Sequence, residues 1–156
     1  AMDFPVPEYP EFEPGGGGLH STARDYLAFC RMILNGGRHG GERLLRPETV
    51  AEMGRSHIGD LLVRPMRSAL PEVSNDAEFW PGMPQKWVLS FLINTEATAE
   101  GRSAGSLAWA GLNNTYYWID PARGLAAVFL TQIRPFFDAK AVRLFRAFEA
   151  AVYRAL

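Results

Sequence analysis

The sequence predicts an α+β fold in which an antiparallel sheet is flanked by an N-terminal helix and a C-terminal helix. The strongest helical spacing of apolar residues lies near the two ends of the chain, in residues 22–34 and after Asp138. Runs suited to strands gather between them, in residues 86–132. This segregation favours antiparallel pairing over alternating β-α-β units. The 156 residues, 47% of them hydrophobic, are enough for one domain with its own core.

The N-terminal segment is expected to be extended. Residues 1–14 form a lead-in rich in proline and glutamate, and proline fixes φ and lacks a donor N–H. The run Gly15–Gly18 permits positive φ or close packing of the backbone. It lacks the Gly-Lys-Ser/Thr continuation of a phosphate-binding loop, so a crowded turn or a pocket wall is the favoured interpretation. The globular domain is therefore expected to span residues 15–156.

Two amphipathic helices are predicted near the ends of this domain. Thr22 and Asp25 have the spacing of a capping box, and Asn35-Gly36-Gly37 supplies a glycine stop, which gives a helix over residues 22–34. Its apolar stripe consists of Tyr26, Phe29, Cys30, Ile33 and Leu34. Asp138 caps the C-terminal helix. The apolar stripe of that helix consists of Val142, Phe145, Phe148 and Val152.

The middle of the chain is less regular. Residues 38–46 are expected to form a turn and a short extended piece, and Pro47 suits the first position of a short helix, Pro47–Met53, which ends at Gly54. Residues 55–85 show little periodicity, and a stretch of this length is often functional, for example as the rim of a binding site. Its large apolar residues either face a pocket or, in the favoured interpretation, pack the loop onto the core. They are Phe79, Trp80 and Met83.

Four strands are predicted after this loop. Residues 86–94 are expected to form one strand and residues 96–102 a polar turn. Three consecutive strands follow in residues 101–132, the last two joined by a turn at residues 120–124. Gly111 lies between two of the strand-like runs. A glycine there indicates a tight bend or a close approach of the backbone to another strand or to a ligand.

Several functions are disfavoured by composition. A net charge of −1 without a basic face argues against nucleic acid, and no apolar run is long enough to cross a membrane. The single cysteine, Cys30, excludes an intrachain disulfide and favours a reducing, cytoplasmic location with the thiol as core filler. The three histidines lack metal-site spacing, so neither a metal nor another cofactor is expected. An enzyme that uses an unmarked pair of acidic or histidine residues stays as an alternative.

A combination of motifs resembles the second half of the serine β-lactamase-like hydrolases. The first part runs from the glycine run at Gly15 through Ser21-Thr22 to Met53. The second part consists of Trp109-Ala110-Gly111, then Asn114–Pro121 and Leu130-Thr131-Gln132. The superfamily includes class C β-lactamases, penicillin-binding proteins and family VIII carboxylesterases. Trp-x-Gly at the third motif is similar to the esterase branch, and the resemblance covers residues 15–153.

The resemblance implies a site as well as a β-lactamase/transpeptidase-like fold. In such enzymes a serine attacks an ester or amide carbonyl, assisted by a lysine and a tyrosine. Carried over by position, Trp109, Ala110 and Gly111 form a wall of the substrate pocket, and the backbone N–H of Leu112 donates to the oxyanion. The resemblance therefore favours an approach to a ligand as the reason for the glycine at Gly111. A tryptophan in place of the usual lysine favours small neutral esters, so that β-lactamase activity would be weak at most.

One departure from the family pattern changes the expectation. The motifs Ser-x-x-Lys and Tyr-x-Asn are missing, and the nearest match, Ser21 to Arg24, ends in an arginine, which is a very poor proton acceptor. In the family these motifs precede the glycine run. The chain is therefore expected to be the C-terminal part of a bacterial serine hydrolase, inactive without an N-terminal part that would be its partner. The alternative is a catalytically inactive binding module that self-associates through an exposed sheet edge.

Overall fold

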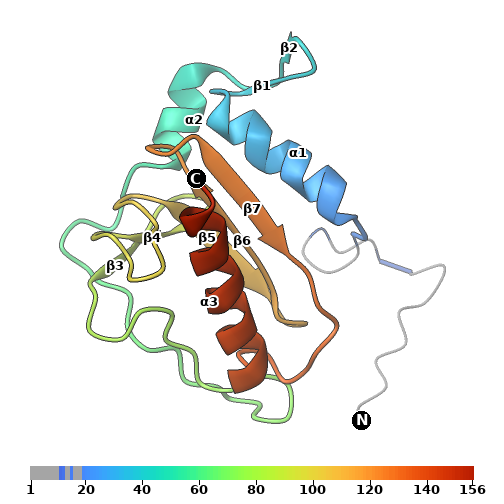
Figure 1. Cartoon of the computed structure of the whole chain (residues 1–156), viewed down its shortest axis with the longest axis vertical. Helices are drawn as coiled ribbons and strands as arrows, with labels where there is room; N and C mark the ends of the chain where they lie inside the picture. Colours follow the sequence, from blue (N-terminus) through green and yellow to red (C-terminus); the bar gives the residue numbers. More distant parts are fainter. Residues whose placement is uncertain (1–10, 13–14, 16–18) are drawn as a thin grey trace.

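The computed structural model describes residues 11–12, 15 and 19–156 of the chain. Most of the expected lead-in and most of the glycine run therefore lie outside the described residues. The α+β architecture predicted from the sequence is confirmed. Helices α1 (Ala23–Leu34) and α2 (Pro47–Met53) cover one face of the main sheet, and helix α3 (Ala139–Arg154) covers the other (Figure 1).

The main sheet has five antiparallel strands in sequence order. They are β3 (Gln85–Trp87), β4 (Leu92–Asn94), β5 (Leu107–Gly111), β6 (Thr115–Asp120) and β7 (Leu125–Phe129). Strands β5 and β6 pair with Trp109 opposite Tyr117 and Gly111 opposite Thr115. Because side chains alternate along a strand, Trp109, Gly111, Thr115 and Tyr117 lie on one face, the face that α1 covers.

The prediction of a single strand over residues 86–94 is wrong. The chain turns back at Leu89 and Ser90, and the N–H of Val88 donates to the carbonyl of Phe91 at 2.9 Å. No glycine, proline or asparagine marks this turn, so the apolar run conceals it. The reversal places both Val88 and Phe91 in the core and leaves Leu89 63% exposed, which gives the sheet five strands instead of four.

The helices begin and end as the sequence predicts. The N–H of Asp25 donates to Thr22 Oγ1 at 3.2 Å, and the Thr22 hydroxyl donates to the Asp25 carboxylate at 2.8 Å. Helix α1 ends in a Schellman motif, in which Gly36 has φ of 59° and the N–H of Gly37 donates to the carbonyl of Met32 at 2.9 Å. Helix α2 has Pro47 at its first position and ends at Gly54. Between them a two-stranded hairpin, β1 (Arg38–His39) and β2 (Glu42–Arg43), replaces the expected turn and extended piece.

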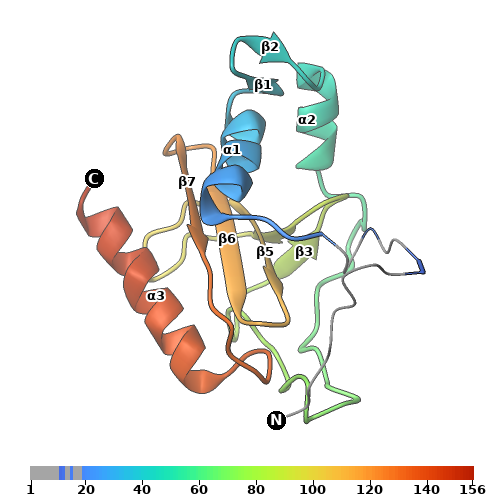
Figure 2. The same ribbon diagram turned by 90° about the vertical axis from the view of Figure 1, so that its right-hand side faces the viewer.

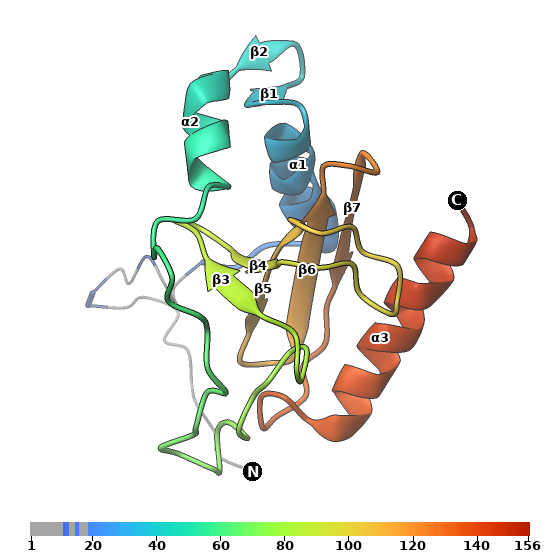
Figure 3. The same ribbon diagram turned by 90° about the vertical axis from the view of Figure 1, so that its left-hand side faces the viewer.

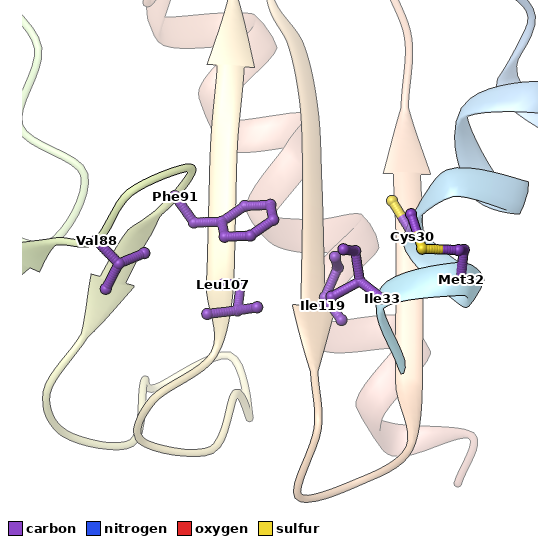
Figure 4. Close-up of a cluster of buried hydrophobic side chains, with 7 residues drawn as sticks. All are labelled: Cys30, Met32, Ile33, Val88, Phe91, Leu107 and Ile119. Atoms are coloured by element: carbon purple, nitrogen blue, oxygen red, sulfur yellow. The ribbon is translucent and has the colours of Figure 1, made fainter. Parts of the chain in front are cut away.

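The sheet divides the interior into two apolar clusters. The cluster between α1 and the sheet is shown in Figure 4 and consists of Cys30, Met32, Ile33, Val88, Phe91, Leu107 and Ile119. Burial raises the pKa of the Cys30 thiol to about 12, so the thiol stays uncharged and serves as core filler, as expected. The cluster between α3 and the sheet contains Ala108, Tyr116, Trp118, Ala127 and Phe145.

A buried ion pair that the sequence does not predict joins α3 to the sheet. The Arg102 guanidinium donates twice to the Glu149 carboxylate, with both distances 2.7 Å, and the two residues are each 1% exposed. The Arg102 guanidinium carbon also lies 5.0 Å from the ring centroid of Trp80 and 5.1 Å from that of Trp118. This places Trp80 in the core, where the favoured interpretation of the loop over residues 55–85 put it. The apparently polar turn over residues 96–102 thus ends in a buried charge.

We expect Glu149→Gln to destabilise the protein by about 3–5 kcal/mol, because it leaves the Arg102 guanidinium buried without a counter-charge. Urea unfolding followed by circular dichroism measures this loss. The matched control is Glu52→Gln in the exposed Glu52–Arg55 pair, which should change stability far less. Equal losses in the two variants would contradict the role assigned to the buried pair.

Candidate functional site

A broad cleft opens on the α1 face of the sheet. Its volume is about 1360 Å³, and strands β5, β6 and β7 contribute Trp109, Gly111, Thr115, Tyr117 and Val128 to it. The start of α1 contributes Ser21, Asp25, Tyr26 and Phe29, and the segment after β7 contributes Leu130, Gln132, Arg134 and Pro135. In Figure 2, α1 lies in front of the upper part of β6, and the lower ends of β6 and β7 are visible below it.

The structure gives a location to each residue of the expected substrate site. Trp109, Ala110 and Gly111 line the cleft. Leu112 follows in the turn between β5 and β6, where its side chain is 52% exposed. Within the described part of the chain, no hydrogen bond engages the backbone N–H of Leu112. The role of these four residues in binding stays a prediction.

Trp109 belongs to an uncharged aromatic group at the side of the cleft. Its ring centroid lies 4.6 Å from that of Trp87 and 5.8 Å from that of Phe79. The ring centroid of Phe79 also lies 5.3 Å from that of Phe137. Phe79 therefore holds the long loop over residues 55–85 against Trp109 of β5 and against the segment after β7. The wall that Trp109 presents is therefore apolar and supported by neighbouring rings.

Gly111 is explained by a close approach within the sheet. A β-carbon at this position would lie 2.6 Å from Thr115 Oγ1, the residue opposite in the hairpin. The close approach is thus to another strand, whereas the resemblance to the family favoured an approach to a ligand. The missing side chain leaves room for the Thr115 hydroxyl, which sequence reasoning did not single out and which lines the same cleft.

Asn114 fixes the turn that carries Leu112. Its side chain is fully buried, and its backbone has a φ of 56°, in the left-handed region. Its amide group donates to the carbonyls of Ile133 and Pro135, both at 2.8 Å. Its amide oxygen accepts from the Tyr116 hydroxyl at 2.8 Å and from the N–H of Asp138 at 3.1 Å. Sequence reasoning missed this role, although asparagine is the residue that tolerates left-handed turns best after glycine.

Asn113 ties the same turn to the segment after β7. Its carbonyl accepts from the Thr131 hydroxyl and from the N–H of Ile133, the latter at 3.3 Å. Its side chain donates to Gln132 Oε1 at 3.1 Å and accepts from Arg134 Nε at 2.7 Å. With Asn114, these bonds hold the backbone around Leu112 in one geometry.

Two tyrosines from different elements meet in the cleft. The ring centroids of Tyr26 and Tyr117 lie 5.0 Å apart. Burial raises the pKa of the Tyr26 phenol, and burial together with the neighbouring Tyr26 raises that of Tyr117. Both phenols therefore stay protonated at neutral pH and do not supply a phenolate base.

The groups of a serine–lysine pair do not come together. The two lysines of the chain are Lys86, whose ammonium donates to the Gly59 carbonyl, and Lys140, which is exposed in the first turn of α3 on the opposite face of the sheet. Ser21 is in the cleft, but its hydroxyl donates to the Thr22 carbonyl at 3.4 Å. Arg24, at the lysine spacing from Ser21, is exposed. No residue in the described ranges thus supplies a lysine base to the cleft.

Neither a cluster of metal ligands nor a membrane-spanning helix is found in the described residues. In that part of the chain no group of three or more histidine, cysteine or acidic residues could hold a metal ion. His20 lines the cleft. His57 lies on the surface, where its Nε2 is 3.2 Å from the Glu52 carboxylate. None of the described helices has the length and hydropathy to span a bilayer.

Comparisons with known proteins agree with this architecture. The sequence model of the β-lactamase family matches residues 1–151. Protein Rv1367c of Mycobacterium tuberculosis is 33% identical over 132 residues, which are 81% of this chain and 30% of that protein. The acyltransferase calJ of Penicillium decumbens is 26% identical over 145 residues, which are 90% of this chain and 33% of that protein.

Solved structures show the same fold. Unliganded simvastatin synthase (LovD) from Aspergillus terreus aligns with a TM-score of 0.63 at 27% identity, over 82% of this chain and 33% of that one. A family VIII carboxylesterase aligns with a TM-score of 0.50 at 23% identity, over 81% of this chain and 30% of that one, which supports the fold alone. The chain spans about a third of the length of the curated relatives it matches.

We expect Asn114→Ala to destabilise the protein by about 3 kcal/mol or more, because buried hydrogen-bond partners are left unpaired and alanine is strained at positive φ. Asn114→Gly should lose less, because glycine accepts this φ although it loses the same four bonds. Chemical denaturation of both variants measures the two contributions. Asn35→Ala, at an exposed asparagine with φ of −87°, is the control and should cost only a fraction as much. Equal stability of the three variants would contradict the role of Asn114.

Proposed function

Because the chain belongs to the β-lactamase family, we propose that it forms the acyl-binding side of a serine-dependent acyl-transfer site. One observation carries the proposal. The strand segment Trp109-Ala110-Gly111 lines the 1360 Å³ cleft, while the described residues bring no serine–lysine pair to it. The nucleophilic serine, its lysine and the assisting tyrosine would then come from a separate segment of a longer polypeptide, the partner of this chain.

In the proposed reaction the serine hydroxyl gives its proton to the lysine while its oxygen attacks the ester carbonyl carbon, and the π electron pair of the carbonyl moves onto the carbonyl oxygen. When this pair returns, the bond to the alcohol oxygen of the ester breaks, the alcohol takes up the proton and leaves, and the acyl group stays on the serine. The N–H of Leu112 donates to this oxyanion, and one fixed donor of this kind contributes roughly 3 kcal/mol to the transition state. The value of such a donor depends on its being held in place before reaction. The bonds of Asn113 and Asn114 to the segment after β7 supply that rigidity.

The substrate class follows from the chemistry of the wall. Trp109, Tyr117 and Val128 offer aromatic and aliphatic contact, and neither lysine of the chain lines the cleft with them. Arg134, which does line the cleft, donates to the Asn113 side chain at 2.7 Å. We therefore propose a small neutral ester as substrate, with weak activity at most toward β-lactams, which carry a carboxylate. The buried, uncharged Cys30 thiol is compatible with the reducing cytoplasm as the proposed location.

In the second half of the proposed reaction the acyl group is transferred from the serine to water or to an alcohol. Transfer to water makes the whole protein a carboxylesterase, which is the proposed activity. The relative calJ is named an acyltransferase, and at 26% identity it supports testing alcohol acceptors beside water. The alternative is a binding module without catalysis, which the lack of a lysine base among the cleft residues favours.

We expect the isolated chain not to turn over p-nitrophenyl butyrate, because no lysine or arginine in the described part of the cleft can act as the base for a serine. Absorbance of released nitrophenol measures this. A burst of nitrophenol that survives extensive purification, together with fluorophosphonate labelling of a serine within residues 1–156, would contradict the proposal.

We expect the isolated chain nevertheless to bind neutral esters in the cleft. Titration with p-nitrophenyl butyrate should shift the nuclear magnetic resonance signals of the Leu112 and Thr115 amides and of the Trp109 indole, and benzylpenicillin should shift them less. Trp109→Ala should weaken binding about 10-fold, since it removes a large aromatic contact. Leu89→Ala, in the exposed turn between β3 and β4, is the control and should bind as the unchanged chain does. Equal affinity of the two variants would contradict the assignment of the wall.

A further inference from the structure

The floor of the cleft is made of rows of side chains that cross the sheet on one face. In the first row Gly111 lies opposite Thr115, beside the turn that carries Leu112. The next row on the same face is apolar, because side chains alternate along each strand. It consists of Trp109, Tyr117 and Val128, which are paired across β5, β6 and β7. Both rows line the cleft.

The third row is closed off by helix α1. It consists of Leu107, Ile119 and Ala126, again paired across the three strands. Leu107 is 5% exposed and Ile119 is fully buried. Ile33 of α1 lies beside Ile119 in the same apolar cluster (Figure 4). None of the third row lines the cleft, so the cleft ends between the second and third rows.

Tyr26, in the first turn of α1, forms this end of the cleft. Its ring centroid lies 5.0 Å from that of Tyr117 and 5.6 Å from that of Phe29, which also lines the cleft. Seen from the opposite side in Figure 3, α1 again lies beside the upper part of β6 only, as it does in Figure 2. These contacts join elements within the described chain, so a further segment of a longer polypeptide is not needed to close this end.

The two ends of the cleft differ in chemistry. At the turn, the Asn113 side chain donates to Gln132 Oε1 at 3.1 Å and accepts from Arg134 Nε at 2.7 Å. From there toward α1 the floor changes to aromatic and aliphatic side chains. Polar groups suit the alcohol part of an ester, and apolar groups suit its acyl chain. An ester whose carbonyl oxygen is bound by the Leu112 N–H therefore directs its acyl chain toward Tyr26.

We propose that Tyr26 is the residue that sets the maximum length of the acyl chain. The proposal rests on the proposed function, which places the ester carbonyl at Leu112. The first and second rows are two residues apart on each strand, a span of roughly 6.8 Å that matches an extended chain of about six carbon atoms. Beyond this length the acyl chain meets the Tyr26 ring, which is packed on Tyr117 and does not lie over open solvent.

The affinity of the full chain for ethyl butyrate, ethyl hexanoate and ethyl octanoate, measured by nuclear magnetic resonance titration, tests the proposal. Ethyl hexanoate should bind about 16-fold more tightly than ethyl butyrate, since burial of each methylene strengthens binding about fourfold. Ethyl octanoate should bind no more tightly than ethyl hexanoate, because its last carbon atoms have no further apolar surface to cover. Affinity that continues to rise in the unchanged chain from hexanoate to octanoate overturns the proposal.

Variants of α1 identify the residue responsible. In Tyr26→Ala the missing ring should let ethyl octanoate bind about tenfold more tightly than ethyl hexanoate. Tyr26→Phe keeps the ring and should keep the limit at hexanoate. The matched control is Leu27→Ala, the next residue on the helix, which packs against the same cluster but does not line the cleft. It should lose stability without a change in length preference.

The outcomes separate this proposal from the proposed function. If Trp109→Ala weakens binding of all three esters while Tyr26→Ala keeps the limit at hexanoate, the role of Tyr26 is wrong and the proposed function stands. If Trp109→Ala weakens none of them, both are contradicted. Thermal melting shows whether each variant is folded. Should Tyr26→Ala not fold, Tyr26→Trp replaces it, and its larger ring should remove the advantage of hexanoate over butyrate; an unchanged profile in that variant overturns the proposal.

Discussion

The position of the candidate site depends on the Asn114 side chain. Its four hydrogen bonds join the β5–β6 turn to the segment after β7 and to the N–H of Asp138, the residue that caps α3. One buried amide therefore joins two parts of the chain that are separate in sequence, residues 114–116 and residues 133–138. Because each of its donors and acceptors is paired, the left-handed backbone at this residue is held without leaving a buried polar group unsatisfied. This turn sets the position and direction of the Leu112 N–H.

The buried ion pair and the candidate site lie on opposite faces of the sheet. The buried pair of Arg102 and Glu149 lies on the α3 side of the sheet, where aromatic rings surround the guanidinium. The cleft lies on the other face, where Trp109 and Tyr117 present neutral aromatic surface. The sheet thus separates a charged contact that joins elements of the fold from the neutral aromatic wall of the cleft, whose charged lining residues Asp25, Glu72 and Arg134 lie outside the strands. Such a separation suits the proposed acyl-transfer site, in which charge is needed at the reacting carbonyl and not along an apolar acyl chain.

Local patterns predicted much of the fold and part of the site. The capping residues Thr22 and Asp138 and the glycine stop after Leu34 act within a few residues, so the helix ends could be read directly. The turn at Leu89 and Ser90 could not be predicted, because it contains no glycine, proline or asparagine and the reversal is enforced by burial of Val88 and Phe91. Trp109-Ala110-Gly111 was found through its resemblance to a family motif. Asn114 and Thr115 were missed, because their partners are distant in sequence or across a hairpin.

The sequence by itself determined the fold class, the three α-helices, the region of the last three strands and the family. Each of these is encoded by short-range periodicity, by caps, or by a combination of motifs. Only the tertiary structure decided that Arg102 and Glu149 are buried together, that the loop over residues 55–85 pairs with β3, and that Gly111 makes room for Thr115. These features depend on contacts between residues far apart in the chain or on opposite strands. The spacing of residue types along the sequence does not show which of these residues come into contact.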